Sequence, residues 1–410
     1  MDEQNRAMRR QVLASLAAGG MAAVTGSWSG LVRAAEAVTL PFENGLRPLT
    51  SDFPQKGEML LLRSRPPLLE TPFDVFDEGV FTPNDRFFVR WHLAGIPTTI
   101  DEHTFRVKVH GAVAHELDLG IADIMNGFDR VELAAVNQCA GNSRGFFKPR
   151  VAGGEWGNGA MGNARWTGVR LKDILDRAGV KAGAVEVRFN GLDEGVVAAT
   201  PDFVKALTVD HARDGEVMVA FGMNGQPLPL LNGFPLRLVV PGWYSTYWMK
   251  MLNDIEVIDT PDRNFWMAKA YQIPDTPHAS VSPEEKSFKT VAINRMVPRS
   301  FVTNLSDGAV LDIGVHRKVR GIAFGGDAGV REVRFSSDDG ATWTTAQLGR
   351  DFGKYSFRRW ETAFVPRRPG RYTLKVMAIN ANGVAQPDKP NWNPGGYMRN
   401  VVEAVTVVAA

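Results

Sequence analysis

Cysteine is nearly absent from this sequence: Cys139 is the one cysteine among 410 residues. A single cysteine cannot form an intrachain disulfide, so a fold held together by disulfides is excluded. Covalent attachment of a c-type haem needs two cysteines, so the chain cannot carry such a haem itself. Cys139 must therefore act alone, either as a small buried side chain or as a metal-binding thiol.

The sequence also has little net charge and no long apolar run. It contains 47 basic and 45 acidic residues, which gives a formal net charge of +2. A protein that binds nucleic acid or an anionic membrane surface is expected to carry a stronger basic excess. A membrane-spanning helix needs about 20 consecutive apolar residues, and no segment offers them. We therefore expect neither nucleic acid binding nor membrane insertion.

What the sequence does contain indicates a large globular protein with many turns. A chain of 410 residues exceeds what one hydrophobic core usually organises, so two domains are expected. The 41 glycines and 24 prolines favour short elements joined by loops over long helical bundles.

The N-terminal segment is typical of an export signal. Arg9 and Arg10 precede a modestly apolar, Gly- and Ala-rich stretch over residues 14–31, and a small-residue pattern ends at Ala37. The alternative, an amphipathic first helix, would need apolar residues at helical spacing, which the stretch lacks. The pattern predicts a twin-arginine signal peptide over residues 1–37 and a periplasmic protein. That route exports folded proteins, so the pattern also indicates a cofactor that is inserted before export.

Residues 38–275 mix strand and helix patterns. A short apolar run over 86–90 is typical of a buried strand, and two further runs end in loops, at 131–138 and 236–240. Short helices are expected over 171–178 and 201–207. Such an α+β arrangement with loops at strand ends is where binding sites tend to be built.

Residues 276–410 have a different pattern, in which strands dominate. The Pro- and Ser-containing stretch 277–283 is typical of a linker. Short strands separated by Gly and Asp turns then follow over 310–315, 319–324, 330–336, 342–348, 360–365 and 371–378. Their spacing predicts an immunoglobulin-like β-sandwich that serves as a scaffold or as a dimer contact.

Five motifs together resemble the sulfite oxidase family. They are Phe87-Phe-Val-Arg-Trp-His92, Gln138-Cys-Ala-Gly-Asn-Ser-Arg144, Ala164-Arg-Trp-Thr-Gly168, Met223-Asn-Gly-Gln-Pro-Leu-Pro229 and Asn232-Gly-Phe-Pro-Leu-Arg237. Each motif alone is weak, but the five in this order, followed by a strand-rich C-terminal domain, are highly specific. The resemblance implies a mixed α+β molybdopterin-binding domain over 38–275 and an immunoglobulin-like dimerisation domain over 276–410. It also implies molybdenum and molybdopterin as cofactors.

The chemistry of Cys139 agrees with this resemblance. A thiolate is a soft ligand, and Gly141 and Arg144 nearby would give access and a cation that favours ionisation. Without other information, a lone cysteine is more often a small buried hydrophobic residue. The resemblance implies that Cys139 supplies sulfur to molybdenum while the dithiolene of the pterin supplies the rest.

The resemblance also implies the residues that bind the substrate and perform catalysis. Sulfite is a small oxyanion, for which arginine offers several charge-assisted hydrogen bonds at once. Arg90 and Arg144 match the family's positions for that task, although ion pairing would be the commoner role of an arginine. Tyr271 matches the family's active-site tyrosine by its distance after Lys250, with Tyr244 and Tyr247 as competitors.

The remaining implied positions contact the cofactor. His92, two residues after Arg90 on an expected strand, points to the same face as Arg90. The full set of cofactor contacts is Phe88, Arg90, His92, Cys139, Asp193, Asn232, Arg237 and Lys250.

Two departures make the expected pocket less cationic than that of vertebrate family members. The resemblance implies an arginine at the position of Gly395, and the loop after Arg144 lacks the expected lysine, although Lys148 is near.

The resemblance implies a sulfite dehydrogenase that oxidises sulfite to sulfate. Two electrons must leave singly, and residues 38–85 leave no room for the family's cytochrome domain. We therefore expect an external c-type cytochrome as acceptor and a homodimer through residues 276–410. Two alternatives stay open: a molybdenum-dependent S- or N-oxide reductase, and an exported binding protein without catalysis.

Overall fold

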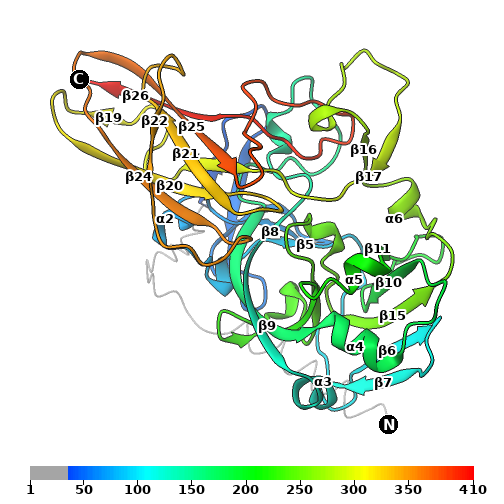
Figure 1. The fold of residues 1–410 in the computed structure, drawn as a ribbon. Coiled ribbons are helices and arrows are strands. Elements are labelled where there is room, and N and C mark those ends of the chain that lie inside the picture. Colours follow the sequence, from blue (N-terminus) through cyan, green and yellow to red (C-terminus); the bar gives the residue numbers. More distant parts are fainter. Residues whose placement is uncertain (1–35) are drawn as a thin grey trace, which may run out of the picture. The chain divides into compact units, whose positions relative to one another are not determined.

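The computed structural model describes residues 36–410, in which the strands form six sheets (Figure 1). The predicted export signal over residues 1–37 lies almost wholly outside these residues. The first sheet is an antiparallel meander of β1 (Ala37–Thr39), β2 (Leu46–Thr50), β3 (Met59–Arg63), β4 (Leu68–Glu70) and β5 (Val89–Arg90). The strand expected over 86–90 is shorter than predicted, because Asn84–Arg86 forms a 3₁₀ turn after α2 (Val75–Glu78).

The second sheet has the order β11 (Lys205–Thr208), β10 (Glu186–Gly191), β15 (Leu252–Ile258), β6 (Arg106–Gly111) and β7 (Leu117–Gly120). The further helices in residues 93–268 are α3 (Ile121–Gly127), α4 (Leu171–Ala178), α5 (Val209–Ala212) and α6 (Phe265–Ala268). The helix expected over 171–178 is confirmed. It buries Leu171, Ile174 and Leu175 on one face and ends at Gly179, whose φ of 69° suits glycine.

The helix expected over 201–207 is wrong. Residues Lys205–Thr208 form β11, which pairs antiparallel with β10 from Glu186 to Phe189. Lys205, Ala206 and Leu207 are all buried, so successive residues on both faces of this strand are covered. Pairing with the preceding strand, β10, overrides the local spacing here.

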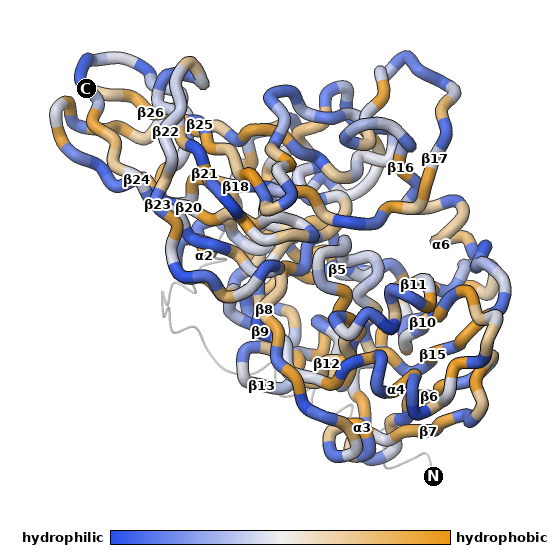
Figure 2. Tube along the Cα trace, viewed as in Figure 1, coloured by the Kyte–Doolittle hydropathy of each residue, from blue (hydrophilic) through white to orange (hydrophobic). Residues whose placement is uncertain are grey.

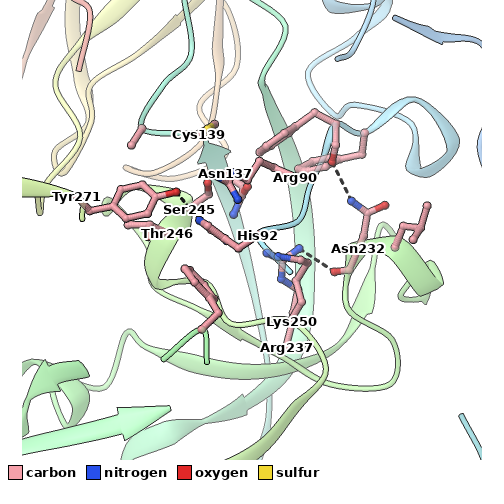
Figure 3. Close-up of a pocket in the computed structure, with 15 residues that line it drawn as sticks. Arg90, His92, Asn137, Cys139, Asn232, Arg237, Ser245, Thr246, Lys250 and Tyr271 are labelled. Carbon is pink, nitrogen blue, oxygen red and sulfur yellow. Dashed lines mark hydrogen bonds between the residues drawn. The ribbon is translucent and has the colours of Figure 1, made fainter. Parts of the chain in front are cut away.

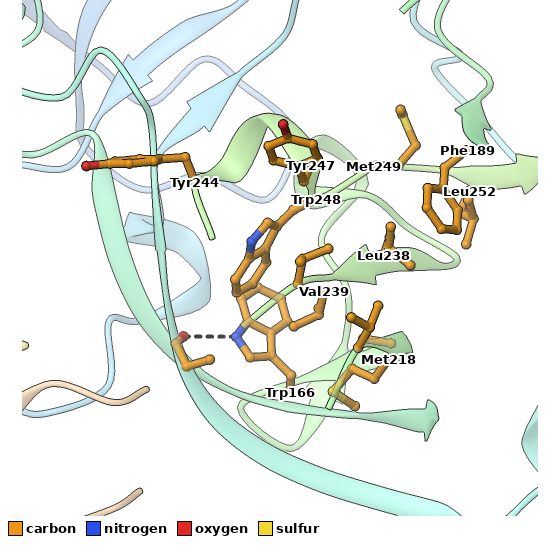
Figure 4. Packing of buried hydrophobic residues seen from close by; sticks show 14 of the residues in the cluster. Trp166, Phe189, Met218, Leu238, Val239, Tyr244, Tyr247, Trp248, Met249 and Leu252 are labelled. Carbon is orange, nitrogen blue, oxygen red and sulfur yellow. Dashed lines mark hydrogen bonds between the residues drawn. The ribbon is translucent and has the colours of Figure 1, made fainter. Parts of the chain in front are cut away.

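The third sheet brings two long strands to the centre of the molecule's largest core. Its order is β13 (Gln226–Pro227), β12 (Met218–Met223), β9 (Met161–Arg170) and β8 (Arg130–Gln138), with β14 (Arg237–Val239) paired to β12. Trp166 on β9 donates from Nε1 to the Ala135 carbonyl of β8 at 3.0 Å and packs edge-on against Trp248 (Figure 4). Apolar stretches follow strands such as β15 in Figure 2. The packing of Trp166 against β8 and Trp248 fixes the end of β8, which Cys139 follows.

A short pair, β16 (Gln272–Pro274) and β17 (Thr290–Ala292), precedes two sheets that share their own core. One sheet has the order β18 (Arg299–Val302), β20 (Arg317–Phe324), β24 (Arg358–Phe364) and β23 (Gln347–Leu348). The other has the order β19 (Val310–Leu311), β26 (Glu403–Ala409), β25 (Gly370–Asn380), β21 (Val330–Ser336) and β22 (Thr344–Thr345). Their shared core includes Val319, Val333, Trp360, Leu374 and Val407. The sandwich is confirmed.

Some details of the sandwich differ from the expected strands. The strand expected over 310–315 is only Val310–Leu311, and the run 342–348 is broken into β22 and β23. The strands β18 and β26 were not predicted, although β26 is hydrogen-bonded to β25 along its length.

Across residues 36–410, no helix has the length and apolarity that crossing a membrane requires.

Candidate active site

A cavity lies where the ends of β5 and β8 meet the loops around β14 (Figure 3). Eight of the predicted site residues line it: Phe88, Arg90, His92, Cys139, Asn232, Arg237, Lys250 and Tyr271. The other two, Arg144 and Asp193, do not line it. The fold therefore gathers residues from distant motifs around one space.

Cys139 reaches this cavity because the last five residues of β8 are buried and aim the chain into it. The Cys139 N–H donates to the Ala160 carbonyl at 2.9 Å, and the Cys139 carbonyl accepts from the Asn142 N–H at 3.0 Å. Asn142 Oδ1 in turn accepts from the Ala160 N–H at 3.0 Å. These bonds hold the thiol in a tight turn, in which Ser143 adopts a left-handed φ of 69°.

The cavity is lined by three cations, Arg90, Arg237 and Lys250, and by no carboxylate of residues 36–410. Burial lowers the pKa of Arg237 to about 9. Burial also lowers the pKa of Lys250 to about 7, against the opposing charge of Asp193. Buried charge without a partner is unfavourable, so the wall is suited to an anionic occupant that would restore these pKa values.

Several buried donors in the wall have no hydrogen-bond partner within the described part of the chain. They are Arg90 Nη1, His92 Nδ1, Asn137 Nδ2, Arg237 Nε and Thr246 Oγ1. Buried polar groups are normally paired, so these atoms fit a ligand rich in acceptors, such as a phosphorylated pterin. The residues present therefore fit the cofactor that the motifs imply.

Sequence reasoning missed Asn137, Ser245 and Thr246. Asn137 could have been found, because it precedes Cys139 by two residues and such positions share one face of a strand. Ser245 and Thr246 belong to the 3₁₀ turn Ser245–Tyr247, and no periodicity indicates where such a turn points.

His92 and Tyr271 form a hydrogen-bonded pair in the cavity, with 2.5 Å between His92 Nε2 and the Tyr271 hydroxyl (Figure 3). Burial, followed by the charges of Arg90 and Lys250, lowers the pKa of His92 well below its ordinary value. Burial raises the pKa of the Tyr271 hydroxyl. Both groups are therefore neutral near pH 7. When Tyr271 donates to Nε2, His92 Nδ1 carries the proton and can donate to an occupant.

The competing tyrosines lie elsewhere. Tyr247 donates its hydroxyl to the Ile293 carbonyl, and neither Tyr244 nor Tyr247 lines the cavity. The geometry thus favours Tyr271 over both.

The two predicted residues that do not line the cavity lie near residues that do: Asp193 near Lys250, and Arg144 near Tyr271. Asp193 is 3% exposed; burial raises its pKa to about 6, against the nearby charge of Lys250. It is placed to balance the charge of Lys250. Arg144 lies against Tyr397, with its guanidinium carbon 5.2 Å from the ring centroid. The charges of Arg90 and Arg144 both oppose the rise in the Tyr271 pKa, so both cations act on the same hydroxyl.

Within residues 36–410 there is no cluster of three or more His, Cys, Asp or Glu side chains that could hold a metal ion. A metal bound by Cys139 would therefore need its other ligands from a separate molecule. That requirement fits the dithiolene sulfurs of a pterin cofactor.

Comparison with known proteins gives matches over both halves of the chain. A model of the oxidoreductase molybdopterin binding domain matches residues 93–266, and a model of the Mo-co oxidoreductase dimerisation domain matches residues 290–409. Human mitochondrial sulfite oxidase is 33% identical over 374 residues, which cover 87% of this chain and 67% of that protein. A barley nitrate reductase is 29% identical over 361 residues, covering 83% of this chain and 40% of that protein.

A solved structure shows the same fold. The sulfane dehydrogenase SoxCD from Paracoccus pantotrophus superimposes with a TM-score of 0.70 at 22% identity. The match covers 95% of this chain and 93% of that chain. The arrangement of a mixed α+β domain followed by a sandwich is therefore shared across nearly the whole length.

Proposed function

Because the chain belongs to the sulfite oxidase family of molybdopterin-dependent oxidoreductases, we propose that it oxidises sulfite to sulfate. Its cofactors are molybdenum and molybdopterin. The observation that carries the proposal is a free thiol, Cys139, that faces a cavity lined by three cations and no carboxylate of the described residues. A soft ligand beside a positive wall suits a metal cofactor and an oxyanion substrate.

Residues of the cavity would hold the cofactor. Cys139 would be the protein ligand, while Arg237 and Lys250 would meet the phosphate and the Asn232 amide would hydrogen-bond the pterin. Asn232 is already oriented: its Oδ1 accepts from Lys56 Nζ at 2.5 Å and its Nδ2 donates to the Phe88 carbonyl at 3.1 Å. The bound cofactor supplies the two-electron redox step and the oxygen atom transfer.

The chain's own residues would bind and orient sulfite. Arg90 and Arg144 would place positive charge on the oxyanion, where two arginines offer several N–H donors. The Tyr271 hydroxyl stays protonated because burial raises its pKa. In the tautomer in which His92 Nε2–H donates to the Tyr271 oxygen, the hydroxyl proton is free to be donated to an oxygen of the substrate. The low-dielectric wall around Cys139 strengthens each of these contacts.

Electrons must then leave the protein one at a time. We propose a separate c-type cytochrome as acceptor, supported by the lack of haem-attachment cysteines in the chain. A periplasmic location is part of this proposal and is supported by the Arg9-Arg10 signal pattern. The match to a dimerisation domain supports a homodimer through the sandwich.

A steady-state assay tests the proposal. Purified, molybdenum-loaded protein should reduce ferricyanide, and then cytochrome c, only when sulfite is present. Nitrate and dimethyl sulfoxide with a reduced dye are the matched alternative substrates, chosen because the barley relative is a nitrate reductase. If nitrate or dimethyl sulfoxide were turned over faster than sulfite, the proposed activity would be reduction of an oxide and not oxidation of sulfite. A protein without stoichiometric molybdenum and without turnover would be a binding protein.

A further inference from the structure

Tyr397 brings the C-terminal domain to the candidate active site. It lies in the loop between β25 and β26, and its ring stacks on Tyr271 with 5.2 Å between centroids and 20° between planes. The backbone fixes it on both sides. The Tyr397 N–H donates to Asn393 Oδ1 at 3.0 Å, and the N–H of Met398 donates to the Ala140 carbonyl at 2.9 Å. Ala140 directly follows Cys139, so this loop is attached to the turn that carries the thiol.

The same ring contacts Arg144, whose guanidinium carbon lies 5.2 Å from its centroid. The hydrogen bonds of this guanidinium are long: 3.3 Å to the Gly154 carbonyl and 3.2 Å to the Gly395 carbonyl. Its Nε is buried and has no partner within residues 36–410. A cation held by weak bonds and an aromatic face keeps N–H groups available for an anion.

Glycines leave the space that this guanidinium occupies. A methyl group at Gly141 would come within 2.5 Å of Nη1 and Nη2, and one at Gly153 within 2.9 Å of Nη1. A methyl group at Gly396 would come within 2.7 Å of Nε. The Arg144 guanidinium therefore occupies a narrow space between these glycines and the Tyr397 ring.

We propose that Tyr397 is a positioning residue that holds the Arg144 guanidinium at the oxyanion site through the face of its ring. The inference deepens the proposed function, because it names what orients one of the two substrate-binding cations. The Gly395 carbonyl and the Tyr397 ring together fix the Arg144 guanidinium.

The test compares two substitutions of Tyr397 in the molybdenum-loaded protein. Tyr397→Phe keeps the ring and is the matched control, while Tyr397→Leu removes the aromatic face. Sulfate, measured by calorimetry without turnover, is the probe of the oxyanion site. The Leu variant should raise the sulfate Kd and the sulfite KM by about three- to thirtyfold, the range for a cation–π contact, with kcat within about twofold. The Phe variant should match the wild type.

A double-mutant cycle with Arg144→Gln separates this role from a general loss of packing. If the ring acts through Arg144, Tyr397→Leu should have no further effect on the sulfate Kd in the Arg144→Gln background. Additive effects would overturn the inference. So would a Phe variant as weak as the Leu variant, or a fall in kcat with KM unchanged.

A second variant keeps the inference testable if the Leu protein does not fold. Gly141→Ala would place a methyl group within 2.5 Å of Arg144 Nη1 and Nη2, so it should displace the guanidinium and weaken sulfate binding while Tyr397 is unchanged. Unchanged sulfate affinity in a folded Gly141→Ala protein would contradict the positioning role. The sulfate cycle does not need turnover, so it decides this inference even if the wild type fails to oxidise sulfite.

Discussion

The Tyr271 hydroxyl lies 2.5 Å from His92 Nε2, and this bond joins two segments of the cavity that are far apart in the chain. Tyr271 adopts a left-handed φ of 56°, which non-glycine residues rarely adopt. The His92 ring stacks on Phe203 with centroids 3.6 Å apart. The surroundings therefore fix both rings, and His92 Nδ1 and the Tyr271 hydroxyl are held in place before a ligand arrives.

Loss of the Arg144 charge should weaken substrate binding and leave the metal in place. Arg144→Gln removes a charge-assisted hydrogen bond worth about 1.5 to 3 kcal/mol. The sulfite KM should rise roughly ten- to a hundredfold, with molybdenum content near that of the wild type. Steady-state kinetics and metal analysis check this. Arg150→Gln, an exposed change in the same loop, is the control and should leave KM unchanged. An unchanged KM for Arg144→Gln would make Arg144 a structural residue.

The buried carboxyl of Glu70 should make stability depend on pH. It accepts from the N–H groups of Gly157 at 2.9 Å and Gly159 at 2.7 Å, in the segment that supports the Cys139 turn. Burial raises its pKa to about 7, against those two hydrogen bonds. The unfolded chain has a pKa of about 4.3 at this group, so the folded state binds more protons between these values. The free energy of unfolding should therefore be highest below about pH 4.5 and fall as the pH rises to about 7. Glu70 should contribute on the order of 3 kcal/mol to this fall.

Urea unfolding at several pH values tests the Glu70 prediction. Glu70→Gln cannot ionise, so the fall between about pH 5 and 7 should be smaller in this variant than in the wild type. Glu116→Gln, at an exposed position, is the control and should follow the wild type. Parallel curves for the wild type and Glu70→Gln would show that Glu70 stays ionised in the fold.

How much of the fold and of the candidate site could be predicted from the sequence depended on whether the contacts that determine each element are local. The helix over 171–178 was predictable because Leu171, Ile174 and Leu175 define its buried face. The strand β11 was mistaken for a helix because its pairing with β10 leaves no local signal. The cavity residues in the five motifs were found by resemblance, whereas the contact of Tyr397 with Tyr271 depends on how the C-terminal loop returns to the cavity.

Export should depend on the paired arginines. The precursor should be cleaved after Ala37 and recovered in the periplasmic fraction if, as we propose, Arg9 and Arg10 form a twin-arginine signal. Replacing both by lysine should leave uncleaved protein in the cytoplasm, as fractionation and mass spectrometry would detect. Replacing Arg33 by lysine is the control. Normal periplasmic recovery of the Arg9→Lys, Arg10→Lys protein would refute the export proposal.

The measurement that tests the central claim most directly compares the wild type with Cys139→Ser for sulfite-dependent turnover and for bound pterin. A serine oxygen is a harder donor than the thiolate. The variant should fold, with an unfolding temperature near that of the wild type, and retain its pterin through Arg237 and Lys250. Sulfite oxidation should nearly vanish in the variant and be rapid in the wild type. Substantial activity in a folded, loaded Cys139→Ser protein would contradict the assignment of Cys139 as the molybdenum ligand.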